Sequence, residues 1–294
     1  MCYDYNRCVY DIKELTKTRC GFELFSAGES VMGKKLYCLG YGRGDKKLFV
    51  NGAHHGLEYI TSAFLMRFLK DFSGCVESGY DMLGFNTRTL YHKVHIICIP
   101  MVNPDGVDIA IHGLDITNRY HRRLISLAGV HSFNKVWQAN ANGVDINHNY
   151  DARWSKIESE PSPSKYSGPY AESEPETKAV CDLIRSENFD MLMAFHSQGG
   201  EIYYDFDSMA SDDDKRIAGK MSAASGYTVA TPTGTAAYGG LKDWFIKEYK
   251  KSGFTVEMGH GKNPLSLKLL DDFYEENAKI LLCAMNELSG IKNE

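Results

Sequence analysis

Histidine and glutamate residues follow or end several short apolar runs in this sequence. His55 and Glu58 come directly after one run, His196 ends the run MLMAF, and Glu257 interrupts the run FTVEMG. Two histidines and one glutamate are a ligand set of catalytic zinc sites, which leave a position open for water. With Glu257 as a further acid in the same kind of place, these residues indicate a candidate metal site.

Each of these residues taken alone has an ordinary structural interpretation. With 10 histidines and 38 acidic residues, about one His-x-x-acid match is expected by chance. His112 and Asp115 make such a match, which we interpret as coincidental. His196 alone would be a satisfied surface or core histidine, and Glu257 alone would form a strand-end salt bridge. The combination favours a site, because all of these residues stand at the ends of buried strands.

The elements that must position these residues alternate between apolar strands and helical patterns. Strand-like runs cover 34–40, 46–53, 94–103, 191–198 and 254–259, and the first two read as neighbouring strands. Helical patterns cover 57–72, 174–187, 240–250 and 266–288. This alternation predicts an α/β fold, with a mixed, mostly parallel twisted sheet covered by helices on both faces. We expect residues 1–294 to form one domain.

Composition and charge exclude some classes of protein and indicate a cellular compartment. The chain has 294 residues, of which 43% are hydrophobic, and its net charge of −5 gives no basic surface for nucleic acid. No segment approaches the roughly 18 apolar residues of a membrane span, and the first residues contain no signal-peptide core. The eight cysteines form no CxxC pair, which favours reduced, buried thiols. We therefore predict a cytoplasmic protein without nucleic-acid partners or membrane insertion.

Six ordered stretches resemble a known family. They are NGAHHGLEYITS, NPDGVD, GVDINHNYDARW, YSGPYAESEPET, FHSQGG and FTVEMGHGKNPL, from about residue 47 to 265. The opening YDYNRCVYDIKEL is also similar to the start of that family's catalytic domain. Together they resemble the zinc carboxypeptidases of carboxypeptidase A type. The resemblance is closest to the bacterial gamma-D-glutamyl-meso-diaminopimelate (gamma-D-glutamyl-L-diamino acid) endopeptidases, which cut cell-wall stem peptides.

The resemblance implies a role for each residue of the metal centre. One zinc ion per chain would be bound by His55, Glu58 and His196, with His54 a neighbour whose side chain points elsewhere. Glu257 matches the glutamate that activates water as the general base.

Further matches concern residues around the metal. Arg122 matches the arginine that stabilises the oxyanion, with Arg119 and Arg123 as alternatives. Asp145 matches an acid that holds the first ligand histidine in its metal-binding tautomer. Asn147 matches an asparagine that helps to bind the carboxylate of the substrate.

Two departures from the family pattern affect substrate binding. His148 stands where the family usually has an arginine, and histidine cannot grip a carboxylate through two parallel hydrogen bonds. The family's mobile active-site tyrosine would fall near Thr235, where Tyr238 is the nearby candidate. Recognition of an ordinary C-terminal carboxylate is therefore in question.

These residues lead to one main functional hypothesis and three alternatives. The main hypothesis is a zinc metallopeptidase that hydrolyses the gamma-D-glutamyl-diamino acid bond of a muropeptide or stem peptide. The alternatives are an ordinary zinc carboxypeptidase, a deacylase of the desuccinylase type, and a non-catalytic muropeptide-binding module. The retained His55, Glu58, His196 and Glu257 argue against the last of these.

Overall fold

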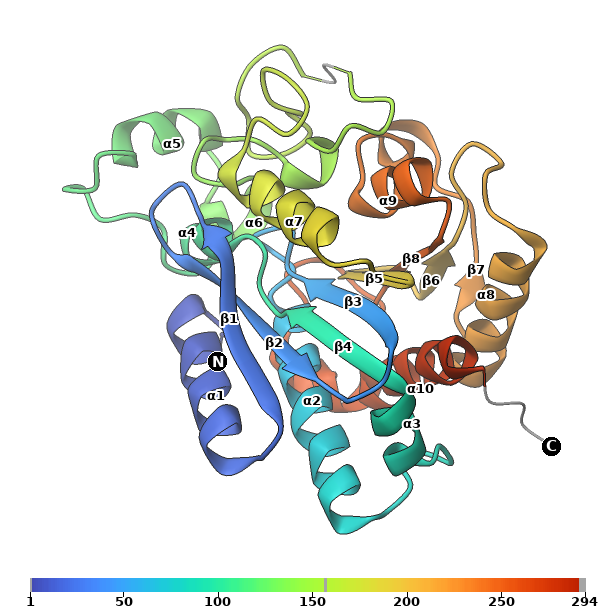
Figure 1. The fold of residues 1–294 in the computed structure, drawn as a ribbon. Coiled ribbons are helices and arrows are strands. Elements are labelled where there is room, and N and C mark those ends of the chain that lie inside the picture. The colour runs from blue at the N-terminus through green and yellow to red at the C-terminus, as the bar shows by residue number, and fades with distance from the viewer. Residues whose placement is uncertain (1, 156–157, 291–294) are drawn as a thin grey trace.

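An eight-stranded sheet runs through the protein in the order β1-β2-β4-β3-β5-β8-β6-β7 (Figure 1). The computed structural model describes residues 2–155 and 158–290. The strands are β1 (Phe22–Glu29), β2 (Lys35–Tyr41), β3 (Lys46–Gly52), β4 (Val94–Ile99), β5 (Met191–His196), β6 (Glu201–Tyr203), β7 (Thr228–Val229) and β8 (Ser252–Glu257). The central strands β4, β3, β5 and β8 are parallel, and antiparallel pairs flank them. The predicted mixed, mostly parallel sheet is confirmed.

Helices precede, connect and follow these strands. They are α1 (Tyr5–Thr18), α2 (Ile60–Ser78), α3 (Thr87–Lys93), α4 (Pro104–His112), α5 (His121–Ala128), α6 (Phe133–Val136), α7 (Pro175–Ser186), α8 (Asp212–Ser225), α9 (Leu241–Tyr249) and α10 (Leu270–Ser289), with short 3-10 turns η1 (Ile146–His148), η2 (Gly234–Ala237) and η3 (Leu267–Leu269). The four predicted helices correspond to α2, α7, α9 and α10. Among the described residues, no helix combines the length and apolarity needed to cross a bilayer.

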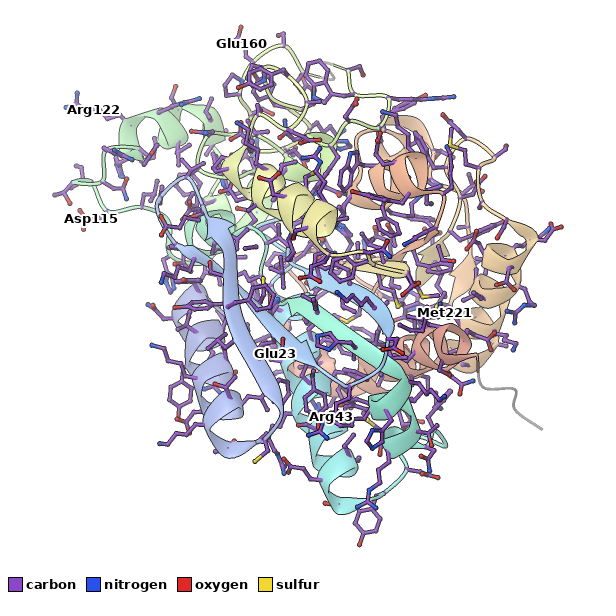
Figure 2. The ribbon with its side chains drawn as sticks, viewed as in Figure 1. Glu23, Arg43, Asp115, Arg122, Glu160 and Met221 are labelled. Carbon is purple, nitrogen blue, oxygen red and sulfur yellow. The ribbon has the colours of Figure 1, made fainter. Side chains whose placement is uncertain are left out.

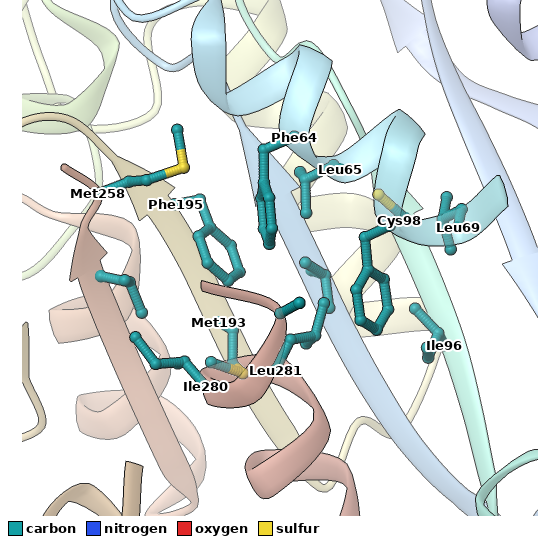
Figure 3. Packing of buried hydrophobic residues seen from close by; sticks show 14 of the residues in the cluster. Phe64, Leu65, Leu69, Ile96, Cys98, Met193, Phe195, Met258, Ile280 and Leu281 are labelled. Atoms are coloured by element: carbon teal, nitrogen blue, oxygen red, sulfur yellow. The ribbon is translucent and has the colours of Figure 1, made fainter. Parts of the chain in front are cut away.

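The two faces of the sheet bury separate hydrophobic clusters because side chains alternate along each strand. Leu48 and Val50 of β3 pack with α2 and α10, whereas Phe49 between them packs with α7 and α9. Helices therefore cover both faces, as predicted (Figure 1). Figure 3 shows the first cluster, in which the Phe64 ring of α2 lies 5.1 Å from the Phe195 ring of β5. This packing fixes the end of β5 relative to the start of α2.

The prediction that 34–40 and 46–53 are neighbouring strands is wrong, because β4 lies between β2 and β3. The connection from β2 to β3 crosses the start of β4 in close contact. A Cβ atom on Gly42 would come within 2.1 Å of the Val94 carbonyl oxygen, and one on Gly44 within 1.8 Å of the Lys93 carbonyl carbon. Only glycine allows this approach, so the two glycines let the chain pass over a strand that comes later in the sequence.

A buried carboxyl group near the start of α7 is not used by the site described below. Glu176 is fully buried, and its oxygens accept hydrogen bonds from the Val31 N–H (3.1 Å) and from Asn140 Nδ2 (3.0 Å). Burial raises the pKa of Glu176 to about 8, although these two hydrogen bonds oppose the shift, and the nearby Asp105 carboxylate adds to it. The folded protein therefore keeps a proton on Glu176 that the unfolded chain releases at lower pH.

This proton makes the stability of the protein depend on pH in a predictable direction. Because the folded pKa lies above the unfolded one, the stabilisation is present below about pH 4.5 and is lost as pH rises through about 8. Glu176→Gln should remove this dependence. Between pH 4.5 and about 8, the free energy of unfolding of the wild type should fall by on the order of 4 kcal/mol relative to that of Glu176→Gln. Urea unfolding at several pH values measures the difference. Replacing the exposed Glu160 (Figure 2) by glutamine is the control, and parallel pH profiles for Glu176→Gln and wild type would contradict the assignment.

Candidate metal centre and active site

Three side chains from two neighbouring strand ends converge at the carboxyl edge of the sheet. His55 and Glu58 lie on the turn between β3 and α2, and His196 is the last residue of β5, which pairs in parallel with β3. His55 Nδ1 lies 2.8 Å from Glu58 Oε1, and His196 Nδ1 lies 3.0 Å from Glu58 Oε2. The two Nδ1 atoms are 3.4 Å apart. The structure thus brings the three predicted ligands together.

Their spacing fits a zinc ion. In tetrahedral zinc sites the metal-ligand bonds of about 2.0–2.2 Å place ligand atoms roughly 3.3 Å from one another. The three distances here, 2.8, 3.0 and 3.4 Å, are close to that value. Glu58 and His196 are also buried, where two facing imidazole nitrogens beside a carboxylate are best explained by a cation between them. Within the described residues this trio is the one His, Cys, Asp and Glu cluster with metal-binding geometry.

Asp145 contacts the other ring nitrogen of His55, Nε2, on the side away from Glu58. Its Oδ1 lies 3.2 Å from His55 Nε2, and its Oδ2 accepts the Lys165 N–H at 2.9 Å. Burial alone would raise the pKa of Asp145, but the neighbouring His55 and His148 bring that pKa well below its usual range. The ionised carboxylate therefore accepts a hydrogen bond from the Nε2–H of His55, which leaves Nδ1 free to bind a metal.

We expect Asp145→Asn to weaken zinc binding by about 10–100-fold, because an amide orients His55 but raises its basicity less. Competition with a chromogenic chelator measures the affinity. Asp151→Asn is the matched control, since Asp151 is exposed on the same loop and binds Lys247 at 3.1 Å. Equal zinc affinity in Asp145→Asn and wild type would remove Asp145 from the metal centre.

A second support holds Glu58 and lies far away in the sequence. Asn263 Nδ2 donates to the Ser197 carbonyl at 2.6 Å and lies 3.5 Å from Glu58 Oε1. The Ser197 N–H lies 3.3 Å from Glu58 Oε2. No role could be predicted for Asn263, because nothing local to GHGKNPL indicates a contact with residue 58.

His54 lies beside the trio and points away from it. Its Nε2 lies 2.9 Å from the Tyr150 hydroxyl, and its ring stacks 5.4 Å from the ring of His196. Burial, with the neighbouring His196, lowers the pKa of His54 well below its ordinary value, so the ring is neutral. His54 thus packs against a ligand without being one of the three converging residues.

Glu257 ends β8 next to the metal centre. In the parallel pairing of β5 and β8 it stands directly beside His196, and across the antiparallel pairing with β6 it faces Glu201. Burial and the charge of Glu58 raise the pKa of Glu257 to about 8, although His55 lowers it. Glu257 is therefore a carboxyl group that can exchange a proton near neutral pH at the edge of the trio.

A cavity of about 110 Å³ opens from these residues. Its lining includes His55, His196 and Glu257. The other lining residues are Asn147, His148, Tyr203, Pro232, Gly240, Leu241, Lys242, Asp243 and Thr255. Tyr203, Lys242 and Asp243 were not predicted as site residues. The only local signal was a Lys-Asp pair one residue after two glycines, in an otherwise apolar helix start.

The predicted substrate-binding residues lie at or near this cavity. Asn147 lines it and accepts the Leu241 N–H through Oδ1 at 3.3 Å. His148 lines it too, and its Nδ1 is hydrogen-bonded to the Tyr238 carbonyl oxygen at 2.8 Å. The Tyr238 side chain is 36% exposed and is not among the lining residues, so its substrate role stays a prediction. The side chain of Thr235 lies outside the described residues.

The structure does not bring Arg122 to the metal centre. Arg122 is exposed on α5 and extends outward at the edge of the molecule (Figure 2). The two alternatives also have partners elsewhere: Arg119 stacks on the Tyr120 ring at 4.8 Å, and Arg123 Nη2 donates to the Asn142 carbonyl at 3.0 Å. In the described part of the chain none of the three lines the cavity. The oxyanion role of Arg122 stays a prediction.

Comparison with known proteins shows which relatives and folds this chain is similar to. The gamma-D-glutamyl-L-diamino acid endopeptidase 1 of Lysinibacillus sphaericus is 33% identical over 288 residues, which cover 96% of this chain and 72% of that protein. The solved structure of thrombin activatable fibrinolysis inhibitor superposes with a TM-score of 0.78 at 20% identity, covering 98% of this chain and 75% of that one. The murein-tripeptide amidase MpaA from Escherichia coli O157 gives 0.55 at 22% identity, covering 94% of each chain.

The two solved structures show that the fold is shared. The family is shown by a match of the sequence to a family model. The profile of the zinc carboxypeptidases matches residues 11–284, which include all three converging residues and Glu257. The chain therefore belongs to the zinc carboxypeptidase family.

Proposed function

We propose that this metallopeptidase hydrolyses the gamma-D-glutamyl-diamino acid bond of peptidoglycan stem peptides, with Glu257 as its general base. The observation that carries the chemistry is the position of Glu257 beside His196, one strand away from the converging His55, Glu58 and His196. The choice of bond is supported by the Lysinibacillus sphaericus relative, whose name states that activity and which aligns over 96% of this chain.

Each residue of the site has a separate role in hydrolysis. Zinc, held by His55, Glu58 and His196, would supply Lewis-acid chemistry and make water acidic enough to react near neutral pH. Glu257, which stands beside His196 at the end of β8, takes a proton from the attacking water and passes it to the leaving amine. Asp145 orients His55, while Ser197 and Asn263 hold Glu58.

His148 supports a substrate other than an ordinary C-terminal residue. Its Nδ1 is engaged with the Tyr238 carbonyl, which leaves Nε2 as the only ring nitrogen that can reach a substrate. A single nitrogen makes one hydrogen bond, whereas an arginine at this position would offer two in parallel. We infer that binding next to the scissile bond depends little on a bidentate carboxylate contact.

The test compares two kinds of substrate on the zinc-loaded protein. Wild type should cleave gamma-D-glutamyl-diamino acid peptides with kcat/KM at least about tenfold above substrates that end in Phe, Leu, Lys or Arg, a difference of about 1.4 kcal/mol. His148→Arg should move this preference towards free C-terminal carboxylates. A wild-type preference for the ordinary C-terminal residues would make the protein a plain carboxypeptidase, and zinc-dependent muropeptide binding without turnover would make it a binding module.

The cellular compartment and the partners of the protein are also part of the proposal. The eight cysteines are free thiols, and five of them are buried, which suits a reducing compartment such as the cytoplasm. Cytoplasmic location and the lack of nucleic-acid partners stay predictions. The partner that we propose is a muropeptide or stem peptide.

A further inference from the structure

The two histidines of the converging trio differ in how their second ring nitrogens are held. His55 Nε2 lies 3.2 Å from Asp145 Oδ1, which fixes the ring and leaves Nδ1 for a metal. The Nδ1 atom of His196 lies 3.0 Å from Glu58, but its Nε2 is buried and makes no hydrogen bond with any described residue. Because a histidine that binds a metal almost always has a partner on its other nitrogen, the ring of His196 needs a different support.

The ring of His54 covers one face of the His196 ring. The two centroids are 5.4 Å apart and the planes are inclined by 25°, so the contact is stacked. Both side chains are buried. The torsion that turns an imidazole about its Cβ–Cγ bond has broad intrinsic minima, so packing must fix the plane of the ring. The stacked contact opposes the rotation that would turn His196 Nδ1 away from Glu58.

His54 is itself fixed from another side by Tyr150. The His54 Nε2 atom lies 2.9 Å from the Tyr150 hydroxyl oxygen, and the two rings are 5.9 Å apart. Tyr150 is fully buried, its ring lies 6.2 Å from the ring of Trp244 on α9, and its N–H donates to the Gly239 carbonyl oxygen at 3.1 Å. The hydroxyl is therefore held in one place, and its hydrogen bond orients His54.

Packing alone does not account for the polar character of this pair. The other ring nitrogen of His54, Nδ1, is buried and has no hydrogen-bond partner among the described residues, which costs free energy. Two apolar rings of the same shape would fill the space without that cost. The hydroxyl also differs from the carboxylate behind His55, because it orients an imidazole without favouring the cationic form of the ring beside a metal ion.

We propose that Tyr150 and His54 are positioning residues for the third zinc ligand, His196. The hydrogen bond between them sets the plane of the His54 ring, and the stacked face of His54 sets the plane of His196, with Nδ1 directed at Glu58. Ring packing thus does for His196 what a carboxylate does for the other ligand histidine. The inference rests on the proposed zinc ligands and is independent of which peptide bond the protein cleaves.

Replacing Tyr150 by phenylalanine removes the hydroxyl and keeps the ring. We expect the zinc affinity of the full chain to fall by about tenfold, the lower end of the range for residues that orient a ligand. Competition with a chromogenic chelator measures it. Tyr274→Phe is the matched control, because the Tyr274 hydroxyl lies 2.6 Å from Asp71 between α10 and α2, and this variant should bind zinc like the wild type. Wild-type affinity in Tyr150→Phe would overturn the inference.

A second substitution tests whether the two residues act through one another. His54→Phe keeps a ring against His196 but cannot bond to the hydroxyl, so its loss of zinc affinity should match that of Tyr150→Phe. The double variant should lose no more than about threefold beyond either single variant, because both changes remove the same hydrogen bond. Losses that multiply in the double variant would overturn the proposed chain of contacts. Each single variant tests the inference by itself if the other fails to fold.

Cobalt in place of zinc provides a readout that a general loss of stability would not change. The visible absorption of bound cobalt depends on ligand geometry, so its band should shift in both single variants, while the Tm of the metal-free protein stays close to that of Tyr274→Phe. At saturating zinc, kcat should fall by about tenfold with little change in KM.

The contrary kinetic result has a specific meaning. Tyr150 follows His148, which lines the cavity, so a variant that disturbed only the substrate side would raise KM. A raised KM with unchanged kcat, zinc affinity and cobalt spectrum would overturn the inference and leave the proposed function intact. A wild type that binds no zinc would contradict the proposed function itself.

Discussion

Replacing Glu257 by glutamine should lower kcat by about 10²–10⁴-fold while the protein keeps its zinc. Glutamine retains the shape of the side chain, so the packing at the end of β8 and the ligands of β3 and β5 should stay in place. It cannot accept a proton from water or return one to the leaving amine. The loss should therefore appear in kcat and not in zinc content or in KM.

The matched control for Glu257→Gln is Glu201→Gln. Glu201 lies opposite Glu257 on β6 and accepts a hydrogen bond from the Tyr203 hydroxyl. Its replacement removes a neighbouring carboxylate but leaves the base, so kcat should change by less than about tenfold. Single-turnover rates and zinc analysis of both variants separate chemistry from metal loss. A near-normal kcat in Glu257→Gln would remove this residue from the mechanism, whatever Glu201→Gln does.

The convergence of the three predicted ligands could be expected from the sequence because their positions follow from local rules, whereas their role as ligands is implied by the family resemblance. His55 and Glu58 lie on one turn after a strand, and His196 ends another strand, so a parallel sheet must bring them to the same edge. The same reasoning placed Glu257, since β8 is also parallel to β5. The strand order could not be predicted: β4 lies between β2 and β3, and the close backbone approach that Gly42 and Gly44 permit is visible only in the structure.

Residues that act through distant contacts could not be predicted in the same way. Asn263 supports Glu58 across 205 positions of the chain, and no spacing pattern reports such a contact. Lys242 and Asp243 are charged residues at a helix start, yet each side chain is only 4% exposed, and Lys242 packs over Gly253. The short strands β6 and β7 escaped prediction as well, because three and two residues are too few to show alternation.

Replacing His196 by alanine should abolish tight zinc binding and, with it, hydrolysis. His55 and Glu58 come from a single turn, whereas His196 is the one ligand supplied by β5. Without it, two ligands and water would have to hold the ion. Because loss of a residue that only supports a ligand costs about 10–100-fold in affinity, loss of a ligand should cost more than about 100-fold. Zinc analysis after dialysis gives the occupancy.

Thermal unfolding supplies a readout for His196→Ala that does not require activity. Zinc that binds only the folded state raises the Tm, so added zinc should stabilise the metal-free wild type but not this variant. His112→Ala is the control, because His112 belongs to the coincidental match with Asp115 and is paired instead with Asp4 at 2.8 Å on the surface. It should bind zinc like the wild type. If His196→Ala kept one zinc per chain and full activity, the third ligand would have to come from elsewhere. The described residues contain no second cluster of metal-binding geometry to supply it, so the assignment of the whole trio would fall together.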